Sequence, residues 1–598
     1  MDKWKEHKLY QICCNYIFPL ILFLYPLRHI HWGLDLWDTG YNYANFRYMG
    51  LAHMDSMWLF STYLANAVGH FLTMLPGGHT LLFMNLYTGL FTSLLAVLSY
   101  LFLSRRAKLP AEVVFVGELA AVSLCFCPTA LLYNYLTYVL FLAGILFLYE
   151  GLSQDKSRYL VLAGIMLGTN VFVRFSNLPE AAMIVGVWAY AVICRKRWKK
   201  VLQETAFCML GYIGSVLAWL GFLSLRYGLS NYAEGIKRLF AMTKTATDYK
   251  ASSMLYRMFS EYIENLYWVN RILCFAVPGL IICMVLPKSL QWAKRTACGI
   301  FAAAAALWLY TRRDAQGNSS FCDLRFDEYS SMQKPATLFL LLTLFICLVR
   351  VFGKKTERKE KLLAGLIFLS VLLTSIGSNN GLFTSFNNLF LAAPYVLWNL
   401  YRLCKSKMEW KIPLLLPLKA LAIMFTAVFL FQSLGFGTRF VFAEATGVKS
   451  TAAAVENNAV LKGIRMSEER AQWLTEISAC VSEKELKGRE VILYGYIPAL
   501  SFYLEMPSAF NPWSDLASYS TASMEAAMEK QKEALAEGKE PPVIILNTDL
   551  AINGGTSPES IATSDPKLAM ILQFMKDHNY TETFSNTKFI LYESLPPS

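Results

Sequence analysis

Long apolar runs alternate with short polar segments along most of the chain. A helix needs about 20 mostly apolar residues to cross the hydrocarbon core of a bilayer. Runs that approach this length predict thirteen membrane-spanning helices, at residues 10–28, 80–103, 111–127, 129–150, 158–173, 179–194, 204–225, 269–287, 296–310, 335–351, 362–377, 384–401 and 413–433. We therefore expect a polytopic α-helical membrane protein.

Basic residues gather in the short segments between these runs, as is typical of cytoplasmic loops. If the N-terminus is cytoplasmic, every even-numbered span ends at such a cluster. An odd number of spans then places the region after Phe431 on the outer face of the cell membrane. The clusters are Arg105/Arg106/Lys108, Lys156/Arg158, Arg195/Lys196/Arg197/Lys199/Lys200, Lys288/Lys294/Arg295, Lys354/Lys355/Arg358/Lys359/Lys361 and Arg402/Lys405/Lys407/Lys411.

The moderately apolar stretch 56–75 is the critical exception. If it crossed the membrane, every later basic cluster would lie outside, so we predict a pair of interfacial helices within a long first external loop, residues 29–79. The first apolar run follows basic residues but has no small-residue cleavage site after it. It is therefore interpreted as an uncleaved first span.

A change of composition near residue 440 predicts a second domain. Charged, alternating sequence replaces the apolar runs, with short buried strands expected at 491–494, 543–546 and 589–592. Helical patterns at 467–483, 521–537 and 566–577 lie among them. We divide the chain into a membrane domain, residues 1–436, and a small extracytoplasmic α/β domain, residues 437–598.

Composition supports this class of protein. The chain is 55% hydrophobic and 16% charged, whereas a soluble protein carries roughly 25% charged residues. The net charge of +12 resides mostly in the loop clusters, so it does not indicate nucleic-acid binding. Most of the 13 cysteines lie in or beside apolar runs, and their spacing supports neither a zinc site nor a disulfide framework.

Two carboxylates follow the first span closely. Asp35 and Asp38 are three residues apart among aromatic side chains, and they share one face if the segment is helical. One suits a general base, and the other suits an orienting group or a metal ligand. The alternative is a solvated interfacial loop that Trp32 and Trp37 anchor at headgroup level.

The acidic loop, the interfacial helices, the many spans and the terminal α/β domain together resemble the GT-C glycosyltransferases. These include protein O-mannosyltransferases, aminoarabinose transferases and oligosaccharyltransferase catalytic subunits. The local motif that carries the resemblance is DLWDTGY at residues 35–41. The resemblance implies that an acidic residue of this loop is the catalytic base and that the donor is a polyprenyl-phosphate-linked or polyprenyl-diphosphate-linked sugar. Asp35 is slightly preferred because it lies nearer the first span.

A departing phosphate needs cations, and a sugar needs polar partners for its hydroxyl groups. Arg174 ends the fifth span, where an arginine is normally paired or functional, so we expect it to contact phosphate; the alternative is a helix-end arginine that snorkels to the interface. Further expected contacts, any of which also fits an ordinary turn or a solvated charge, are Tyr41, Asn134, Asn379, Asn380 and Arg312.

A divalent cation is left open. Asp35 and Asp38, together with phosphate oxygens, suit Mg²⁺ or Mn²⁺, and His29 and His31 offer softer ligands. The sequence does not decide whether a metal takes part.

We expect transfer of a hexosyl or pentosyl group from the lipid-linked donor to a glycan, lipid or protein acceptor. A transporter or lipid-linked-glycan flippase is the alternative from another class, but it predicts ionisable groups near the midplane and duplicated halves, and neither is evident in the sequence. A ligase that transfers a whole glycan differs mainly in donor size. A non-catalytic scaffold whose terminal domain binds a partner is also left open.

Overall fold

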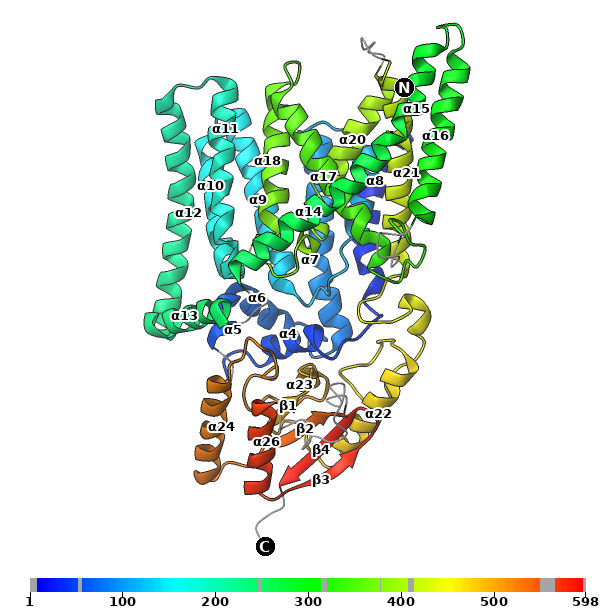
Figure 1. Ribbon diagram of the computed structural model, residues 1–598. Helices are drawn as coiled ribbons and strands as arrows, with labels where there is room; N and C mark the ends of the chain where they lie inside the picture. Colours follow the sequence, from blue (N-terminus) through cyan, green and yellow to red (C-terminus); the bar gives the residue numbers. More distant parts are fainter. Residues whose placement is uncertain are drawn as a thin grey trace.

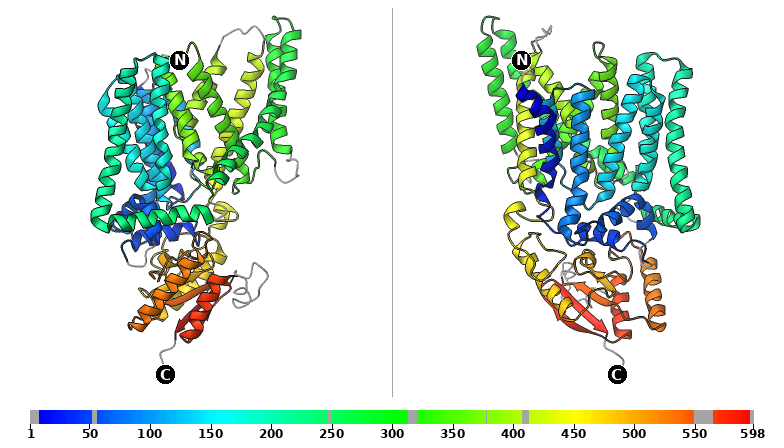
Figure 2. Two further views of the ribbon diagram at one scale, coloured as in Figure 1. Left: turned by 60° about the vertical axis from the view of Figure 1, so that its left-hand side comes forward. Right: turned by 180° about the vertical axis from the view of Figure 1, so that it is seen from behind.

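The computed structural model describes residues 8–51, 56–245, 250–312, 320–376, 378–406, 413–548 and 565–594. A layer of long, roughly parallel helices forms one part, and a smaller mixed domain lies at one end of it (Figure 1). Short helices lie across the layer where the two parts meet (Figure 2). The first span begins at the far end of the helical layer, and the terminal domain lies at the opposite end, as the odd number of predicted spans requires.

Helices occupy all or part of each of the thirteen predicted ranges. Eight helical segments of the described chain are long and apolar enough to cross a membrane, and Ser157–Val173 is a shorter apolar helix. The protein is thus a multi-pass membrane protein, and the count of thirteen remains a prediction. The eight segments are Lys8–His29, Leu81–Arg106, Leu132–Gln154, Phe175–Cys194, Trp198–Tyr227, Ser252–Val285, Ser330–Phe352 and Leu415–Arg439.

The individual elements of the layer follow in chain order. They are α2 (Lys8–Ile12), η1 (Cys13–Ile17), α3 (Phe18–Leu24), η2 (Tyr25–His29), α7 (Leu81–Leu101), η3 (Phe102–Arg106), α8 (Ala111–Ser123), α9 (Leu132–Gln154), α10 (Ser157–Val173), η4 (Phe175–Met183), α11 (Ile184–Cys194), α12 (Trp198–Tyr227), α14 (Ala251–Cys274), α15 (Ala276–Val285), α16 (Gln291–Thr311), α17 (Ser330–Phe352), α18 (Arg358–Thr374), α19 (Phe383–Phe386), α20 (Ala392–Lys405) and α21 (Leu415–Arg439).

Ion pairs join several of the predicted cytoplasmic segments to one another. Arg106 lies 3.8 Å from Glu150 at the end of α9, and Lys200 of α12 lies 2.6 Å from Asp155 in the α9–α10 turn. Arg402 of α20 contacts Glu360 of α18 at 2.7 Å. These segments therefore share one end of the layer, as the alternating topology requires; Lys407 and Lys411 lie outside the described residues.

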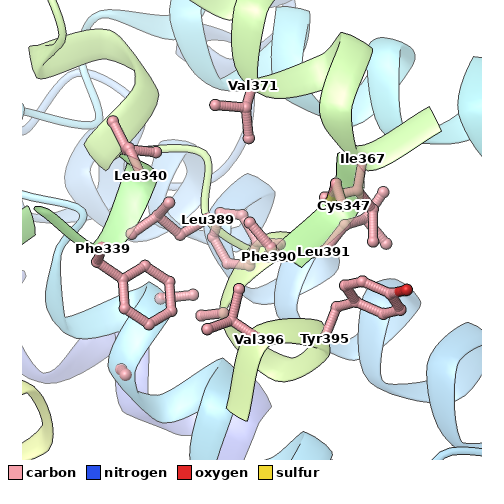
Figure 3. Close-up of a cluster of buried hydrophobic side chains, with 14 of the residues drawn as sticks. Phe339, Leu340, Cys347, Ile367, Val371, Leu389, Phe390, Leu391, Tyr395 and Val396 are labelled. Atoms are coloured by element: carbon pink, nitrogen blue, oxygen red, sulfur yellow. The ribbon is translucent and has the colours of Figure 1, made fainter. Parts of the chain in front are cut away.

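The centre of the layer is a dry core. Figure 3 shows side chains of α17, α18 and α20 meeting there, among them Phe339, Val371 and Tyr395. The Phe339 ring stacks on Phe429 of α21 with centroids 4.0 Å apart. Such interlocked rings fix the relative positions of the helices whose ends carry the site.

Helices α10 and α12 approach each other through glycine. A Cβ atom on Gly164 would lie 2.0 Å from the Cys208 carbonyl oxygen, and one on Gly211 would lie 2.0 Å from the Val161 carbonyl oxygen. Small residues allow this backbone contact, which is a common way to pack membrane helices.

Four helices lie across the end of the layer next to the terminal domain. The predicted interfacial pair is present as α5 (Ser56–Ser61) and α6 (Tyr63–Thr73), preceded by α4 (Asp38–Arg47). Helix α6 packs closely on α4, because a Cβ atom on Gly69 would lie 2.3 Å from the Phe46 ring. The fourth is α13 (Leu229–Thr245).

The terminal domain contains a four-stranded mixed sheet in the order β1-β2-β4-β3. Strands β1 and β2 are parallel, and the other two pairings are antiparallel. The sequence pattern predicts three of the strands and the three main helices but not the edge strand β3, none of whose residues is fully buried. The elements are η6 (Gly447–Ser450), α22 (Glu468–Glu483), β1 (Val491–Tyr494), α23 (Leu500–Tyr503), α24 (Thr521–Ala536), β2 (Val543–Asn547), α26 (Pro566–Asp577), β3 (Tyr580–Ser585) and β4 (Phe589–Ser594).

One hydrophobic core joins this domain to the first loop. Leu34 and Tyr43 are buried together with Ile464, Leu500 and Phe502, although more than 400 residues of sequence separate the two groups. A salt bridge between Arg47 and Glu505, 2.9 Å long, adds a polar contact at the edge. The first loop and the terminal domain therefore lie on the same side of the helical layer.

The α10–α12 contact makes a test of packing possible within one helix. Gly211→Val places side-chain atoms against the Val161 carbonyl, which no rotamer change relieves, and overpacking of this kind costs ~1–3 kcal/mol. We expect a lower thermal midpoint and lower folded yield in detergent. Gly214→Val on the same helix meets no atom within 4 Å and serves as the control. Equal midpoints for the two variants would contradict the close contact.

Candidate active site

The acidic turn is held by its backbone. Three successive carbonyl groups accept hydrogen bonds from the terminal domain: Arg470 donates to Leu34, the Tyr503 hydroxyl donates to Asp35 at 2.7 Å, and the Ala499 amide donates to Leu36 at 3.0 Å. Because all three acceptors belong to one short segment, the turn has little freedom to move independently of the domain.

The Asp35 side chain fixes the start of α4. Its carboxylate is 1% exposed and accepts hydrogen bonds from the Trp37 amide at 2.9 Å, the Thr39 amide at 3.0 Å and the Thr39 hydroxyl. These are donors that a helix start leaves without partners. Burial raises the pKa of Asp35, and the hydrogen bonds from Thr39 and Trp37 oppose that rise.

Asp38 is in a different position. It is the first residue of α4, half-buried, and its carboxylate makes no hydrogen bond or ion pair with any described residue. Burial, together with the neighbouring Asp35 charge, raises the pKa of Asp38 to about 7. A carboxylate that has no hydrogen-bond partner and a pKa near 7 is able to accept a proton near physiological pH.

A cavity opens beside the acidic turn, with about 890 Å³ of space between atoms including its open mouth. Asp35 and Thr39 line one side, and Phe436 and Phe440 line another. Arg28 also lines it, held by hydrogen bonds of 2.9 and 2.7 Å to the Gly437 carbonyl. The cavity thus combines an apolar wall with a fixed cation at the end of the first span.

Arg174 and Asn134 lie together in a second, smaller cavity. The Arg174 guanidinium donates to the Asn134 side-chain oxygen at 3.2 Å and lies 5.3 Å from the centroid of the Tyr133 ring. Ser176 and Thr384 also line this cavity. Arg174 has no carboxylate partner within the described parts of the chain, so its charge and most of its donors remain available to an anion.

Cys127 and Tyr138 connect the two regions. Cys127 lines the larger cavity and lies within electrostatic reach of Asp38. Tyr138 lines the smaller cavity and lies within electrostatic reach of both Cys127 and Arg174. The Asp38 carboxylate and the Arg174 guanidinium therefore lie near the same end of the helical layer, with Cys127 and Tyr138 between them.

The other predicted contacts lie elsewhere. Tyr41 is buried against Trp58 and Trp513, between α4 and the terminal domain. Asn379 and Asn380 lie in the loop after α18, where the Asn379 carbonyl accepts a hydrogen bond of 3.1 Å from Arg257. Arg312 follows α16 on the surface. Neither Asn380 nor Arg312 has a described contact with Asp38 or Arg174.

The residues described do not provide a metal site of the usual kind. No group of three or more His, Cys, Asp or Glu side chains gathers within the described ranges. Both Asp35 oxygens accept hydrogen bonds from Thr39, and His31 lies on the surface beside the Gly463 carbonyl. The observed donors do not fit a bound Mg²⁺ or Mn²⁺ without an added ligand, so no chemical step is assigned to a metal.

Sequence reasoning missed the residues that position the site. Arg470 and Tyr503 belong to the terminal domain, and nothing in their local sequence relates them to a loop near residue 35. Asn387 belongs to a polar segment that the sequence does show, and its side-chain oxygen accepts hydrogen bonds from the Phe126 amide at 3.0 Å and the Cys127 amide at 3.2 Å. Arg28 was detectable in principle, because an arginine at a span end is costly unless it is paired or functional.

Comparison with solved structures returns matches of low sequence identity that cover most of this chain. An archaeal oligosaccharyltransferase, AglB from Archaeoglobus fulgidus, in a structure tethered to an acceptor peptide with an NVT sequon, is 10% identical with a TM-score of 0.48, and the match covers 99% of this chain and 75% of that one. ArnT from Cupriavidus metallidurans bound to undecaprenyl phosphate is 11% identical with a TM-score of 0.36, and the match covers 98% and 97%.

ArnT in the apo state is 10% identical with a TM-score of 0.38 over the same shares of the two chains. No family model matches the chain, and no curated protein matches it. Likenesses at this level of identity and TM-score assign no role to any residue of this chain.

The different environments of the two acids predict opposite effects on stability. Asp35→Asn removes an acceptor oxygen from buried donors, which costs ~1–3 kcal/mol, so its thermal midpoint should fall. Asp38→Asn removes a carboxylate whose folded pKa, about 7, exceeds its usual 3.8, so the folded state is increasingly penalised as pH rises from about 3.8 to about 7 and carries the full penalty above that range.

The Asp38→Asn midpoint should therefore equal or exceed that of the wild type at about pH 8, with the difference shrinking at about pH 5. Differential scanning fluorimetry of both variants in detergent measures this. A larger loss of stability for Asp38→Asn than for Asp35→Asn would contradict the assignment.

Proposed function

We propose that this protein is an integral membrane glycosyltransferase that moves a sugar from a polyprenyl-phosphate-linked donor to an acceptor at the outer face of the cell membrane. Asp38 acts as the general base, Asp35 positions it, and Arg174 contacts the donor phosphate. The outer-face location rests on the alternation of basic clusters, which places the terminal domain opposite the cytoplasmic loops.

One observation carries the proposal: a half-buried carboxylate without a partner in the described chain lies just beyond a membrane span, beside a cavity with an apolar wall. A soluble substrate would not require this location. A donor whose lipid tail stays in the bilayer presents its phosphate and sugar at this depth. The Arg28 cation lines this cavity and the Arg174 cation lines the smaller one, which suits a phosphate.

The reaction follows from these positions. Asp38 accepts the proton of an acceptor hydroxyl, and the oxygen attacks the anomeric carbon of the donor sugar. The bond between that carbon and the phosphate oxygen breaks, and the phosphate leaves with the electron pair. Arg174 stabilises the charge that develops on the phosphate, in a site where little water competes. The proton stays on Asp38 until solvent removes it.

A transporter is the alternative, and one observation bears on it. Glu118 lies within α8, and both of its oxygens are buried without a hydrogen-bond partner among the described residues. Ionisable groups at this depth are typical of transport pathways. However, the candidate anion contacts gather at the layer end next to the terminal domain, which favours chemistry at an interface over passage through the membrane.

The proposed base predicts the activity and the pH profile together. Asp38→Asn should reduce transfer by a factor of ~10² to 10⁴, the usual contribution of a general base, with folded yield unchanged. In the wild type, kcat/KM should rise as pH increases through about 7 and level off above it, because only the ionised carboxylate accepts a proton.

Both are measured by transfer of radiolabelled sugar from a panel of synthetic polyprenyl-phosphate donors in membranes that contain the expressed protein. Full activity in Asp38→Asn would eliminate this mechanism.

The proposed phosphate contact predicts lipid binding independently of turnover. Arg174→Gln removes a charge-assisted interaction worth ~1.5–3 kcal/mol, so affinity for undecaprenyl phosphate should fall by at least tenfold. Native mass spectrometry of the purified protein with added lipid measures it. Arg238→Gln, an exposed arginine that pairs with Glu234 on α13, is the control and should bind as the wild type does. Equal binding by all three proteins would remove Arg174 from the site.

A further inference from the structure

A pocket distinct from both cavities lies between α4, α5 and the terminal domain. It has about 380 Å³ of space between atoms, including its open side. Aromatic rings and small polar side chains line it, and none of the lining residues carries a charge. They are Tyr41, Ala44, Asn45, Tyr48, Trp58, Ser501, Ser508, Phe510, Asn511 and Pro512.

The pocket begins one helical turn from Asp38. Asp38, Tyr41, Asn45 and Tyr48 follow one another at intervals of three or four residues, so they form one stripe along α4. At about 100° per residue, Thr39 faces nearly opposite Tyr41, and Asp38 lies between them. Thr39 lines the larger cavity and Tyr41 lines the pocket, so the two spaces lie on opposite faces of α4 with Asp38 at the boundary.

Several polar groups of the pocket have no partner in the described chain. The Ser508 hydroxyl is buried without a hydrogen bond, and its residue is only 5% exposed. The Asn45 amide and the Tyr48 hydroxyl also make no hydrogen bond with a described residue. Asn511 uses its oxygen to accept from the Trp513 amide at 2.9 Å, which leaves its NH₂ group. A buried polar group without a partner is costly, so these groups suit a ligand with several hydroxyls.

Aromatic side chains add apolar surface to this pocket. Tyr41 meets Trp58 and Trp513 edge-on, with centroids 6.0 and 5.3 Å apart. Aromatic walls bind the C–H faces of a sugar ring, while amides and hydroxyls match its hydroxyl groups. The absence of charge among the lining residues disfavours a phosphate, a carboxylate or an amine, whose burial without a counter-charge is expensive.

We propose that this pocket binds a neutral sugar unit of the acceptor, and that the acceptor is therefore a glycan or a glycosylated molecule. The inference rests on the proposed function in taking Asp38 as the base. The acceptor hydroxyl reaches Asp38 from the pocket side of α4, and the donor reaches it from the cavity side. The base thus lies between the donor and the acceptor, which reach it from opposite faces of α4.

Binding of simple sugars tests the pocket without knowledge of the natural acceptor. The probes are the neutral methyl glycosides of glucose, galactose, mannose and N-acetylglucosamine, added to the full-length protein in nanodiscs and observed by saturation-transfer difference NMR. At least one should bind with a Kd in the millimolar range, about −4 kcal/mol, as expected for a single ring. Asn45→Leu should abolish the signal, and Tyr48→Phe should weaken it by about threefold to tenfold through loss of one hydrogen bond.

Asn231→Leu, the same substitution at an exposed position of α13, should leave the signal unchanged. Asp38→Asn should also keep it, because Asp38 borders the pocket without lining it. Failure of every glycoside to bind, or equal binding by Asn45→Leu, Tyr48→Phe and the wild type, would overturn the inference.

The two proposals fail differently. If Asp38→Asn loses transfer but no sugar binds, the proposed enzymatic function stands and the proposed sugar pocket is wrong. If sugar binding depends on Asn45 but the protein has no transferase activity, the sugar pocket stands and the proposed enzymatic function is wrong.

Discussion

The anchoring of one short backbone segment organises the site. The carbonyl groups of residues 34–36 all accept hydrogen bonds from the terminal domain, and the hydrophobic core around them contains side chains from both parts of the molecule. Buried carbonyls of a loop must find partners, and here a separate domain supplies them. Because the turn is fixed in this way, the direction of α4 and the position of its first residue are fixed as well.

Asp35 and Asp38 have different surroundings because of this arrangement. Asp35 is occupied by donors of its own helix, whereas Asp38, one turn further, has none in the described chain. The same helix separates a cavity that has an apolar wall and an arginine from an uncharged aromatic pocket. A single helix thus places the proposed base between these two spaces, and precise placement is what proximity effects in catalysis require.

Much of the fold was predictable because apolar length and basic loops are strong signals. The helical ranges, the interfacial pair 56–75 and three of the four strands follow from them directly. Strand β3 was not predictable, since polar residues dominate its sequence and its Tyr580 and Phe584 are only partly buried against the hydrophobic clusters of the domain. Glu118 was not predicted to matter, because a single carboxylate in an apolar run barely changes the average hydropathy of that run.

The candidate site was less predictable than the fold. The importance of the loop at 35–38 was visible from its position after the first span, but the distinction between Asp35 and Asp38 depends on which amides point at which carboxylate. Arg174 and Asn134 were singled out separately, and their contact arises only because α9 and α10 pack side by side. Arg470 and Tyr503 could not be found, since their partners lie hundreds of residues away.

The hydrogen bond from the Tyr503 hydroxyl to the Asp35 carbonyl joins residues 468 positions apart. The ribosome adds roughly 5–20 residues each second, so the acidic turn leaves it many seconds before its partner exists. Until then the first loop lacks the surface that gives it shape. The acidic turn therefore acquires its anchored form only after the terminal domain has been made, and a chain interrupted before that domain would lack the partners of this turn.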